Sequence, residues 1–169
     1  MKKWMLLWCC VTLPVLSAQW TNTVAPDFQL NDQAGKSRQL SEFKDRWLVV
    51  YFYPKDKTSG CTTEAQNFAR DYDKFRRANA EVVGVSLDDV ASHRDFASIH
   101  KLPFPLLADV DKKMSKAYGV LGLGGLYSKR ETFVINPDGT IVKHYNDVDP
   151  ENHSTELLRD LVALKLEPR

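Results

Sequence analysis

Two apolar runs of strand-forming residues, each followed by a helical pattern, constrain the fold of this chain most. The first run, WLVVYFY, covers residues 47–53, and the second, EVVGVSL, covers residues 81–87. Neither run alternates between apolar and polar residues, which is typical of a strand covered on both faces of a sheet. The pattern turns helical from Thr62 after the first run, and residues 88–102 predict a second helix closed by Pro103. This order predicts an α/β domain.

The rest of the chain adds strands and helices around these units. The other predicted elements are a hairpin over residues 27–40, a third strand over 104–109, a short helix over 112–119, a second hairpin over 131–145 and a closing helix over 150–167. Residues 19–26 are expected to be an exposed lead-in. We therefore expect a central mixed β-sheet flanked by helices, with an extra hairpin near the N-terminus.

The first 18 residues differ from the remainder. A Lys-Lys pair precedes an apolar stretch from Trp4 to Leu16, and small residues follow it. This is the layout of a secretory signal peptide, whereas a membrane-spanning helix needs about 20 apolar residues. A buried first helix is the alternative, and Pro14 argues against it. We expect a signal peptide over residues 1–18, one domain over residues 19–169 and export, to a bacterial periplasm.

Charge and cysteine content bound the functions that the chain can have. A formal net charge of +1 gives no electrostatic reason to expect a nucleic-acid partner. Cys9 and Cys10 lie within the predicted signal peptide, so Cys61 would be the one cysteine of the exported chain. An unpaired cysteine in an oxidising compartment indicates a reactive thiol, but a single cysteine is also often an inert core residue. Cysteine counting leaves both interpretations open.

The local sequence around Cys61 favours a reactive thiol. A free cysteine is mostly protonated at neutral pH, so a reactive one needs neighbours that stabilise its thiolate. The start of a helix supplies unpaired N–H groups, and Gly60 lets the backbone approach closely. Thr58 can donate a hydrogen bond to the sulfur or to a bound oxygen, and Pro54 can exclude water.

The segment PKDKTSGC, residues 54–61, resembles the P-x-x-x-T-x-x-C active-site motif of the peroxiredoxins. The wider segment YFYPKDKTSGCTTEA is similar to the Q-type, or bacterioferritin comigratory, members of that family. Five later segments match in the same order: VVGVSLD, SHRDF, LPFPLLAD, AYGV and RETFVINPDGTI. The resemblance covers about residues 24–165 and implies a thioredoxin-like fold of the peroxiredoxin type.

The resemblance also implies a thiol-dependent peroxidase that reduces hydrogen peroxide and organic hydroperoxides. Cys61 would be the peroxidatic nucleophile, which becomes a sulfenic acid, while Thr58 orients the peroxide and Pro54 shields the sulfur. Arg130, in KRETFVI, would stabilise both the thiolate and the transition state. Glu64 either pairs with that arginine or caps the helix. No cofactor and no metal is expected, because the histidines lack metal-ligand spacing.

The chain departs from many Q-type relatives at the position of their second, resolving cysteine, where it has Gln66. No cysteine follows further on, so the resemblance implies a one-cysteine cycle in which an external thiol reduces the sulfenic acid. That reductant would be a low-molecular-weight thiol or a thioredoxin-like or glutaredoxin-like protein. A monomer without a membrane span is expected. The glycine-rich segment 119–129 is either a loop near the site or a loop packed on the core.

Two other kinds of function remain open at this point. A disulfide exchanger needs two nearby cysteines for turnover, and the exported chain would have one. A non-enzymatic peroxide sensor, or a holdase-type binding protein, would keep the same fold. The binding protein would tolerate loss of Cys61, whereas a peroxidase would not.

Overall fold

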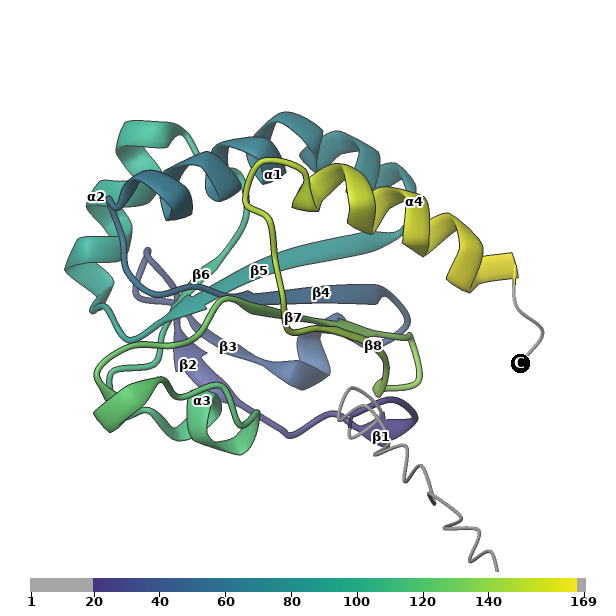
Figure 1. Cartoon of the computed structure of the whole chain (residues 1–169), viewed down its shortest axis with the longest axis horizontal. Helices are drawn as coiled ribbons and strands as arrows, with labels where there is room; N and C mark the ends of the chain where they lie inside the picture. Colours follow the sequence, from purple (N-terminus) through teal and green to yellow (C-terminus); the bar gives the residue numbers. More distant parts are fainter. Residues whose placement is uncertain (1–19, 167–169) are drawn as a thin grey trace, which may run out of the picture.

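The computed structural model describes residues 20–166, so the signal peptide expected over residues 1–18 lies outside the described residues. Within this part of the chain, six strands form one sheet in the order β1-β8-β7-β4-β5-β6, and β2 and β3 form a separate hairpin (Figure 1). The strands are β1 (Thr23–Val24), β2 (Gln29–Asn31), β3 (Ser37–Gln39), β4 (Trp47–Phe52), β5 (Ala80–Ser86), β6 (Leu106–Ala108), β7 (Glu131–Ile135) and β8 (Thr140–Tyr145). The helices are α1 (Ser59–Arg77), α2 (Val90–His100), α3 (Lys113–Ala117) and α4 (His153–Leu166), with short 3-10 turns η2 (Leu40–Phe43) and η3 (Leu123–Gly125).

The sheet is mixed, as the sequence predicts. Strands β4, β5 and β6 are parallel, whereas β7 runs antiparallel to β4, and β8 runs antiparallel to β7. The predicted lead-in differs from the structure, because Thr23 and Val24 form β1 and pair with β8. Pairing of this kind covers backbone groups that the edge of a sheet would otherwise expose.

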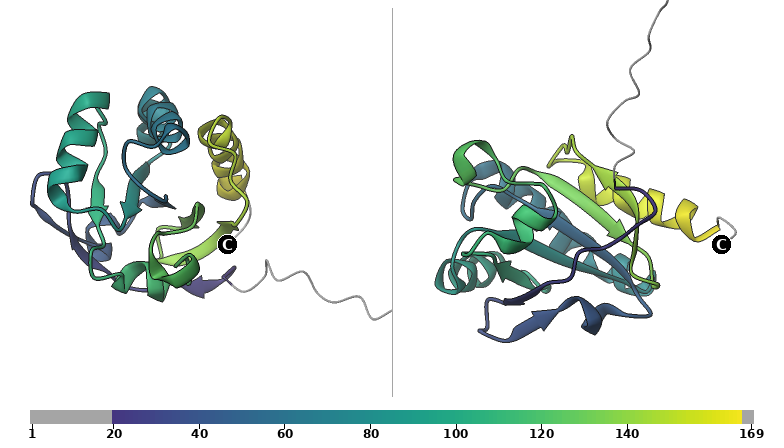
Figure 2. Two further views of the ribbon diagram at one scale, coloured as in Figure 1. Left: turned by 60° about the vertical axis from the view of Figure 1, so that its left-hand side comes forward. Right: turned by 90° about the horizontal axis from the view of Figure 1, so that it is seen from below.

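The two faces of the sheet are covered by different elements. Helices α1, α2 and α4 lie side by side over one face, and the β2–β3 hairpin and α3 lie on the other (Figures 1 and 2). In β4, Val49 and Tyr51 belong to the core under α1 and α4, and Val50 and Phe52 belong to the core of the opposite face. Burial on both faces explains why the sequence of β4 is apolar throughout.

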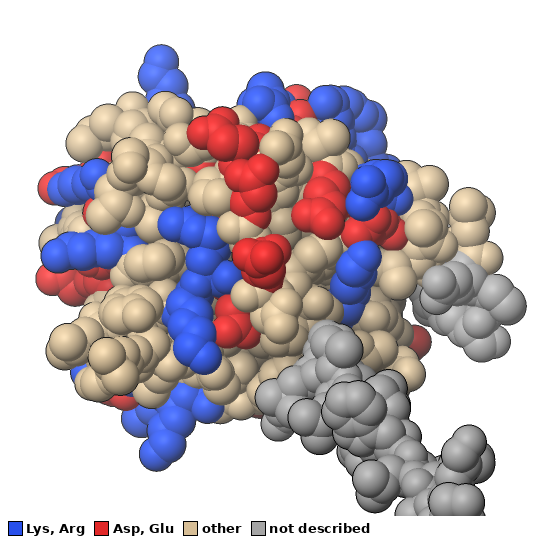
Figure 3. Space-filling model, in the orientation of Figure 1, with Lys and Arg blue, Asp and Glu red and all other residues tan. Residues whose placement is uncertain are grey.

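The surface carries both signs of charge. Lys and Arg side chains lie beside Asp and Glu side chains on the face seen in Figure 3, in keeping with the formal net charge of +1. Among residues 20–166, no helix has the length and apolar character that crossing a membrane requires.

Gly84 in β5 makes room for a tyrosine that joins the sheet to α1. Gly84 pairs with Tyr51 of β4, and a Cβ atom at Gly84 would lie 2.7 Å from the Tyr51 hydroxyl oxygen. A glycine inside a strand usually marks such a close approach. The ring of Tyr51 stacks on Phe68 of α1 at a centroid distance of 4.6 Å. The glycine therefore helps to seat the helix that carries Cys61.

We expect Gly84→Ala to lower the free energy of unfolding by about 1–3 kcal/mol, because the added methyl group overpacks the core. Urea denaturation followed by circular dichroism measures the change. Adding Tyr51→Phe should recover part of the loss, since it removes the oxygen that the methyl group meets and that has no hydrogen-bond partner among the described residues. A Gly84→Ala protein as stable as the wild type would contradict this packing.

Candidate active site

Cys61 lies inside the first turn of α1. The helix begins at Ser59 with Thr58 as its N-cap residue, three residues before the start that the sequence pattern predicts. The Thr62 N–H donates to the carbonyl oxygen of Thr58 at 2.9 Å, so the first helical hydrogen bond already spans the cysteine. The Cys61 side chain is 1% exposed and faces the core. Its sulfur is therefore buried at the positive end of the helix dipole.

Arg130 reaches this sulfur from the neighbouring strand. Because β7 runs antiparallel to β4, the residue that precedes β7 lies beside the end of β4, where the chain turns into α1. Arg130 Nη2 donates to Cys61 Sγ at 3.3 Å, and Nη1 donates to Oε2 of Glu64. Cys61 and Glu64 are three residues apart on one face of α1. One guanidinium thus holds both side chains, and the structure brings Arg130 and Cys61 together as the sequence predicts.

Gly60 leaves the space that the guanidinium occupies. A Cβ atom at this position would lie 3.3 Å from Arg130 Nη2, which is closer than an ordinary van der Waals contact. The expectation that a glycine permits close approach here is therefore confirmed, although the group that approaches is the arginine side chain.

Glu64 is a buried acid that the sequence left between two interpretations. The structure shows the pairing with Arg130. The Glu64 side chain is 1% exposed, and its Oε1 has no hydrogen-bond partner among residues 20–166. Burial raises the pKa of Glu64 to about 7, although the positive charge and hydrogen bond of Arg130 act in the opposite direction. Near neutral pH this carboxyl group can therefore gain or lose a proton.

Thr58 and Pro54 flank the loop that leads into α1. The Thr58 hydroxyl donates to the carbonyl oxygen of Lys55 at 3.0 Å, rather than to the sulfur or to a bound oxygen, the two acceptors that the sequence analysis considered. With its proton engaged, the Thr58 oxygen keeps lone pairs that can accept a hydrogen bond from a bound peroxide. Pro54 is half-buried two residues after the end of β4, and its shielding of the sulfur stays a prediction.

Asp56 anchors the loop 54–58 to α2. The sequence analysis did not predict this role. Its carboxylate accepts hydrogen bonds from the Tyr53 hydroxyl at 2.7 Å, from the Ser92 hydroxyl at 2.8 Å and from His93 Nδ1 at 2.8 Å. His93 Nε2 also faces an acceptor, the Leu107 carbonyl oxygen, at 3.1 Å. The imidazole ring therefore bridges the Asp56 carboxyl group and the backbone of β6, and this buried contact ties the loop to α2.

The anchor also holds a backbone conformation that residues with a side chain seldom adopt. Lys57, which follows Asp56, has a φ of 63°, in the left-handed region. Such conformations persist where surrounding contacts enforce them, and they are common at functional sites. The position of Thr58 and of the first turn of α1 therefore depends on Asp56.

Asp56→Asn should lower the free energy of unfolding by about 3 kcal/mol, because it removes the charged acceptor that Tyr53, Ser92 and His93 share and leaves buried polar groups without full partners. Burial works against ionisation of Asp56, but the hydrogen bonds and charge of His93, with Tyr53 and Ser92, hold its pKa below the usual value. The wild-type carboxylate thus adds stability above its unfolded pKa of about 4, and this stability is lost as the pH falls through the lower folded pKa.

Urea denaturation at several acidic pH values checks this expectation. The wild type should lose stability on acidification more steeply than Asp56→Asn. Asp95→Asn is the matched control, since Asp95 is exposed and forms only a 3.4 Å surface pair with Lys57. Equal acid dependence in the wild type and Asp56→Asn would contradict the anchor.

The structure also describes two further segments named in the sequence analysis. Gln66, at the position of the resolving cysteine in relatives, is exposed and its Nε2 lies 3.2 Å from His100 Nδ1. The segment 119–129 is packed on the core in part, and its nearness to the site stays a prediction. Val120 is buried in the core, whereas Leu123 and Leu126 at the tip are 87% and 80% exposed.

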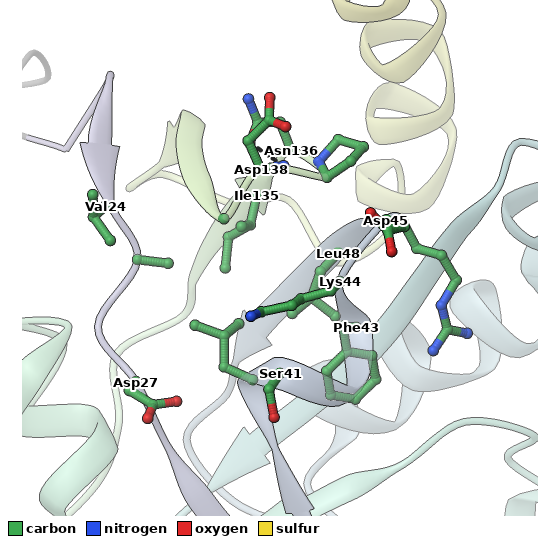
Figure 4. Close-up of a pocket in the computed structure, with 15 residues that line it drawn as sticks. Val24, Asp27, Ser41, Phe43, Lys44, Asp45, Leu48, Ile135, Asn136 and Asp138 are labelled. Atoms are coloured by element: carbon green, nitrogen blue, oxygen red, sulfur yellow. Dashed lines mark hydrogen bonds between the residues drawn. The ribbon is translucent and has the colours of Figure 1, made fainter.

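A cavity of about 600 Å³ lies at the other end of the sheet (Figure 4). Its floor includes Phe43, Leu48 and Ile135, and Lys44 and Asp45 are among the charged residues around it. Leu48 is near the start of β4 and Ile135 ends β7, whereas Cys61 and Arg130 lie by the opposite ends of these strands. The cavity is therefore separate from the cysteine site.

A buried cysteine in the first turn of a helix, with an arginine guanidinium against its sulfur, has surroundings of the kind found at reactive cysteines. Residues 21–144 match the model of the AhpC/TSA family. The chain therefore belongs to the AhpC/TSA family, and its relatives are peroxiredoxins of the Q type, as the sequence motifs indicated.

The relatives include plant and bacterial proteins. The chain is 46% identical over 144 residues to "Peroxiredoxin Q, chloroplastic" of Oryza sativa subsp. japonica, covering 84% of this chain and 66% of that protein. It is 47% identical over 141 residues to the protein of the same name from Arabidopsis thaliana, covering 82% of this chain and 65% of that protein. The chain thus spans slightly less than two thirds of the length of these plant relatives.

The solved structures agree with the predicted fold. Peroxidoxin BcpB from Mycobacterium tuberculosis is 34% identical with a TM-score of 0.79, covering 85% of this chain and 97% of that one. The bacterioferritin comigratory protein of Xanthomonas campestris is 34% identical with a TM-score of 0.77, covering 81% of this chain and 91% of that one. These likenesses confirm the thioredoxin-like fold of the peroxiredoxin type.

Proposed function

We propose that this protein is a thiol-dependent peroxidase that works through Cys61 alone. The observation that carries the proposal is the 3.3 Å contact from Arg130 Nη2 to Cys61 Sγ, made by a fixed positive charge to a buried sulfur. A guanidinium stays charged at every relevant pH, so it favours the thiolate, which is the nucleophilic form. Membership of the AhpC/TSA family supports the same function.

The reaction follows from the geometry of these groups. The thiolate attacks one peroxide oxygen, so an S–O bond forms, the O–O bond breaks, and the electron pair moves onto the departing oxygen. Arg130 and the free N–H groups at the start of α1 are donors near the place where this charge develops. The Thr58 oxygen accepts a hydrogen bond from the peroxide, and Pro54 keeps water from the sulfur.

Hydrogen peroxide and organic hydroperoxides are the proposed substrates. A peroxide is small enough to approach a sulfur that is 1% exposed, provided that the loop 54–58 admits it. The structure of the Xanthomonas campestris relative was described in connection with its alkyl peroxide reduction activity, which supports the wider substrate class here.

The sulfenic acid is then reduced by an external thiol. Cys61 is the free cysteine of residues 20–166, and Gln66 stands where relatives have their resolving cysteine. The reductant is a low-molecular-weight thiol or a thioredoxin-like or glutaredoxin-like protein. A monomer, exported by residues 1–18 to a bacterial periplasm, completes the proposal. The plant relatives reported above are chloroplastic by name. Their names support a targeted protein, but they do not support a periplasmic one.

Arg130→Ala should slow peroxide reduction about 100-fold or more, because the variant loses the charged donor that faces the sulfur. Cys61→Ser should abolish it. Consumption of hydrogen peroxide by reduced protein with dithiothreitol measures both effects. Lys129→Ala is the matched control, since Lys129 is exposed and its 3.8 Å pair is with Glu131. Arg130→Ala activity equal to that of Lys129→Ala would contradict the proposed role.

Thr58→Val should slow the reaction about 10-fold or more, whereas Thr58→Ser should keep most of the activity, because serine retains the hydroxyl oxygen. The same peroxide-consumption assay compares the two variants. Equal losses in Thr58→Val and Thr58→Ser would show that the methyl group, rather than the accepting oxygen, is what matters at this position.

A further inference from the structure

The Cys61 site contains two acids and one neighbouring cation. Cys61 and Glu64 are both 1% exposed, and the two arms of the Arg130 guanidinium donate to one each. If both acids were ionised, the buried site would hold a net negative charge next to the core. Burying an uncompensated charge is costly, so the geometry favours a state in which one of the two acids keeps a proton.

Within residues 20–166, the elements around this site do not supply a second compensating charge. Tyr51 of β4 is neutral, because burial raises the pKa of its hydroxyl well above the ordinary value. His153 at the start of α4 lies within electrostatic reach of Arg130, and burial lowers its pKa to about 4. Its ring is therefore neutral near neutral pH. Among the described residues, the groups beside Glu64 that can carry a charge near neutral pH are therefore Cys61 on α1 and Arg130 next to β7.

The contacts of Glu64 indicate which acid holds the proton. Oε2 receives the hydrogen bond from Arg130, but Oε1 is buried without a partner among the described residues. An ionised carboxylate with one unpartnered, buried oxygen is poorly stabilised, whereas a neutral carboxyl group in the same place costs less. The Cys61 sulfur, in contrast, lies at the start of a helix and receives the other arm of the guanidinium.

We propose that Glu64 stores the proton that the Cys61 thiol gives up, and returns it to the oxygen that departs when the peroxide is cleaved. The inference rests on the proposed peroxidase function. It assigns Glu64 a role beyond orienting Arg130. With Glu64 as the proton donor, the oxidation of Cys61 takes no proton from the solvent.

The atoms and charges balance through the cycle. In the resting site, Cys61 is a thiolate and Glu64 a neutral carboxyl group. Sulfur takes one oxygen and becomes a sulfenic acid, and the other oxygen leaves as hydroxide, which accepts the Glu64 proton and departs as water. Glu64 is then the one anion beside Arg130, so the site has the same charge before and after the step. When an external thiol regenerates the Cys61 thiol, its proton passes back to Glu64.

A simple orienting role predicts a different proton balance. If Glu64 stayed ionised throughout, a thiolate that reacts with hydrogen peroxide would take one proton from the solvent for every cysteine oxidised. The same uptake is expected of any variant that keeps the thiolate but lacks a titratable group at position 64. Proton exchange with the solvent therefore separates the two roles, whereas a loss of rate would not.

The test mixes reduced protein with one equivalent of hydrogen peroxide in stopped flow, in weak buffer with a pH indicator dye. The pH is set about one unit above 7, so that the Glu64 carboxylate left beside the neutral sulfenic acid stays ionised, whereas in the resting site the neighbouring thiolate keeps this carboxyl group protonated. Tryptophan fluorescence follows the oxidation, and thiolate absorbance in the ultraviolet reports the state of the sulfur. The signal of Cys61→Ser is subtracted. Glu64→Gln, which keeps a hydrogen-bond acceptor for Arg130, is the informative variant.

The wild type should take up essentially no protons as Cys61 is oxidised, and Glu64→Gln should take up about one per cysteine. Glu131→Gln is the matched control and should behave like the wild type, because Glu131 is a buried acid whose Oε2 lies 2.8 Å from His144 Nε2. Uptake of about one proton per cysteine by the wild type would by itself overturn the inference, whatever the result for Glu64→Gln. No uptake by a folded Glu64→Gln would overturn it as well.

The pH profile of the oxidation rate gives a second readout. In the wild type the rate should decline as Glu64 ionises above neutral pH, and in Glu64→Gln this decline should vanish. A decline that persists in Glu64→Gln would also contradict the inference. If the wild type is not oxidised faster than a free thiol, the proposed peroxidase function itself fails. If the wild type is oxidised fast but takes up a proton, the proposed peroxidase function stands, and Glu64 is not the source of the proton.

Discussion

The guanidinium of Arg130, shared between Cys61 and Glu64, is the interaction on which the site depends. Three features of the fold converge on it. The antiparallel pairing of β7 with β4 brings the start of β7 next to the end of β4. The first two turns of α1 present both acids on one face, and Gly60 leaves the necessary space. A buried thiolate would be unstable without this partner, because Arg130 is the cation that contacts the sulfur in the described part of the chain.

The strained approach to α1 shows how the fold holds this arrangement in place. The loop 54–58 contains a left-handed lysine, and the buried Asp56–His93 pair ties the loop to α2. The aromatic stack of Tyr51 and Phe68 fixes the other side of α1 to the sheet. Catalytic groups placed by rigid contacts need little reorganisation during the reaction, which is the basis of electrostatic catalysis. Stability and reactivity therefore draw on the same contacts.

Local patterns in the sequence predicted most of the fold. The sequence pattern predicted the strands β4 and β5 and the two hairpins, β2–β3 and β7–β8, at the places where the structure has them. The family motif also predicted correctly that Cys61 and Arg130 are neighbours. Most of the missed features depend on contacts between distant segments. Sequence spacing does not predict the pairing of Val24 with β8 or the contact between Asp56 and His93, because each depends on a partner from a distant segment. The direction of the Thr58 hydroxyl depends on the conformation of the loop 54–58.

The rate of oxidation of Cys61 in the wild-type protein shows whether the shared guanidinium makes the sulfur reactive. Reduced protein would be mixed with a small excess of hydrogen peroxide, and the second-order rate constant would be taken from tryptophan fluorescence, with sulfenic acid at Cys61 identified by mass spectrometry. The account predicts a rate constant more than about 100-fold above that of free cysteine at the same pH. A rate constant equal to that of free cysteine would contradict it, because the shared guanidinium would then give the sulfur no advantage.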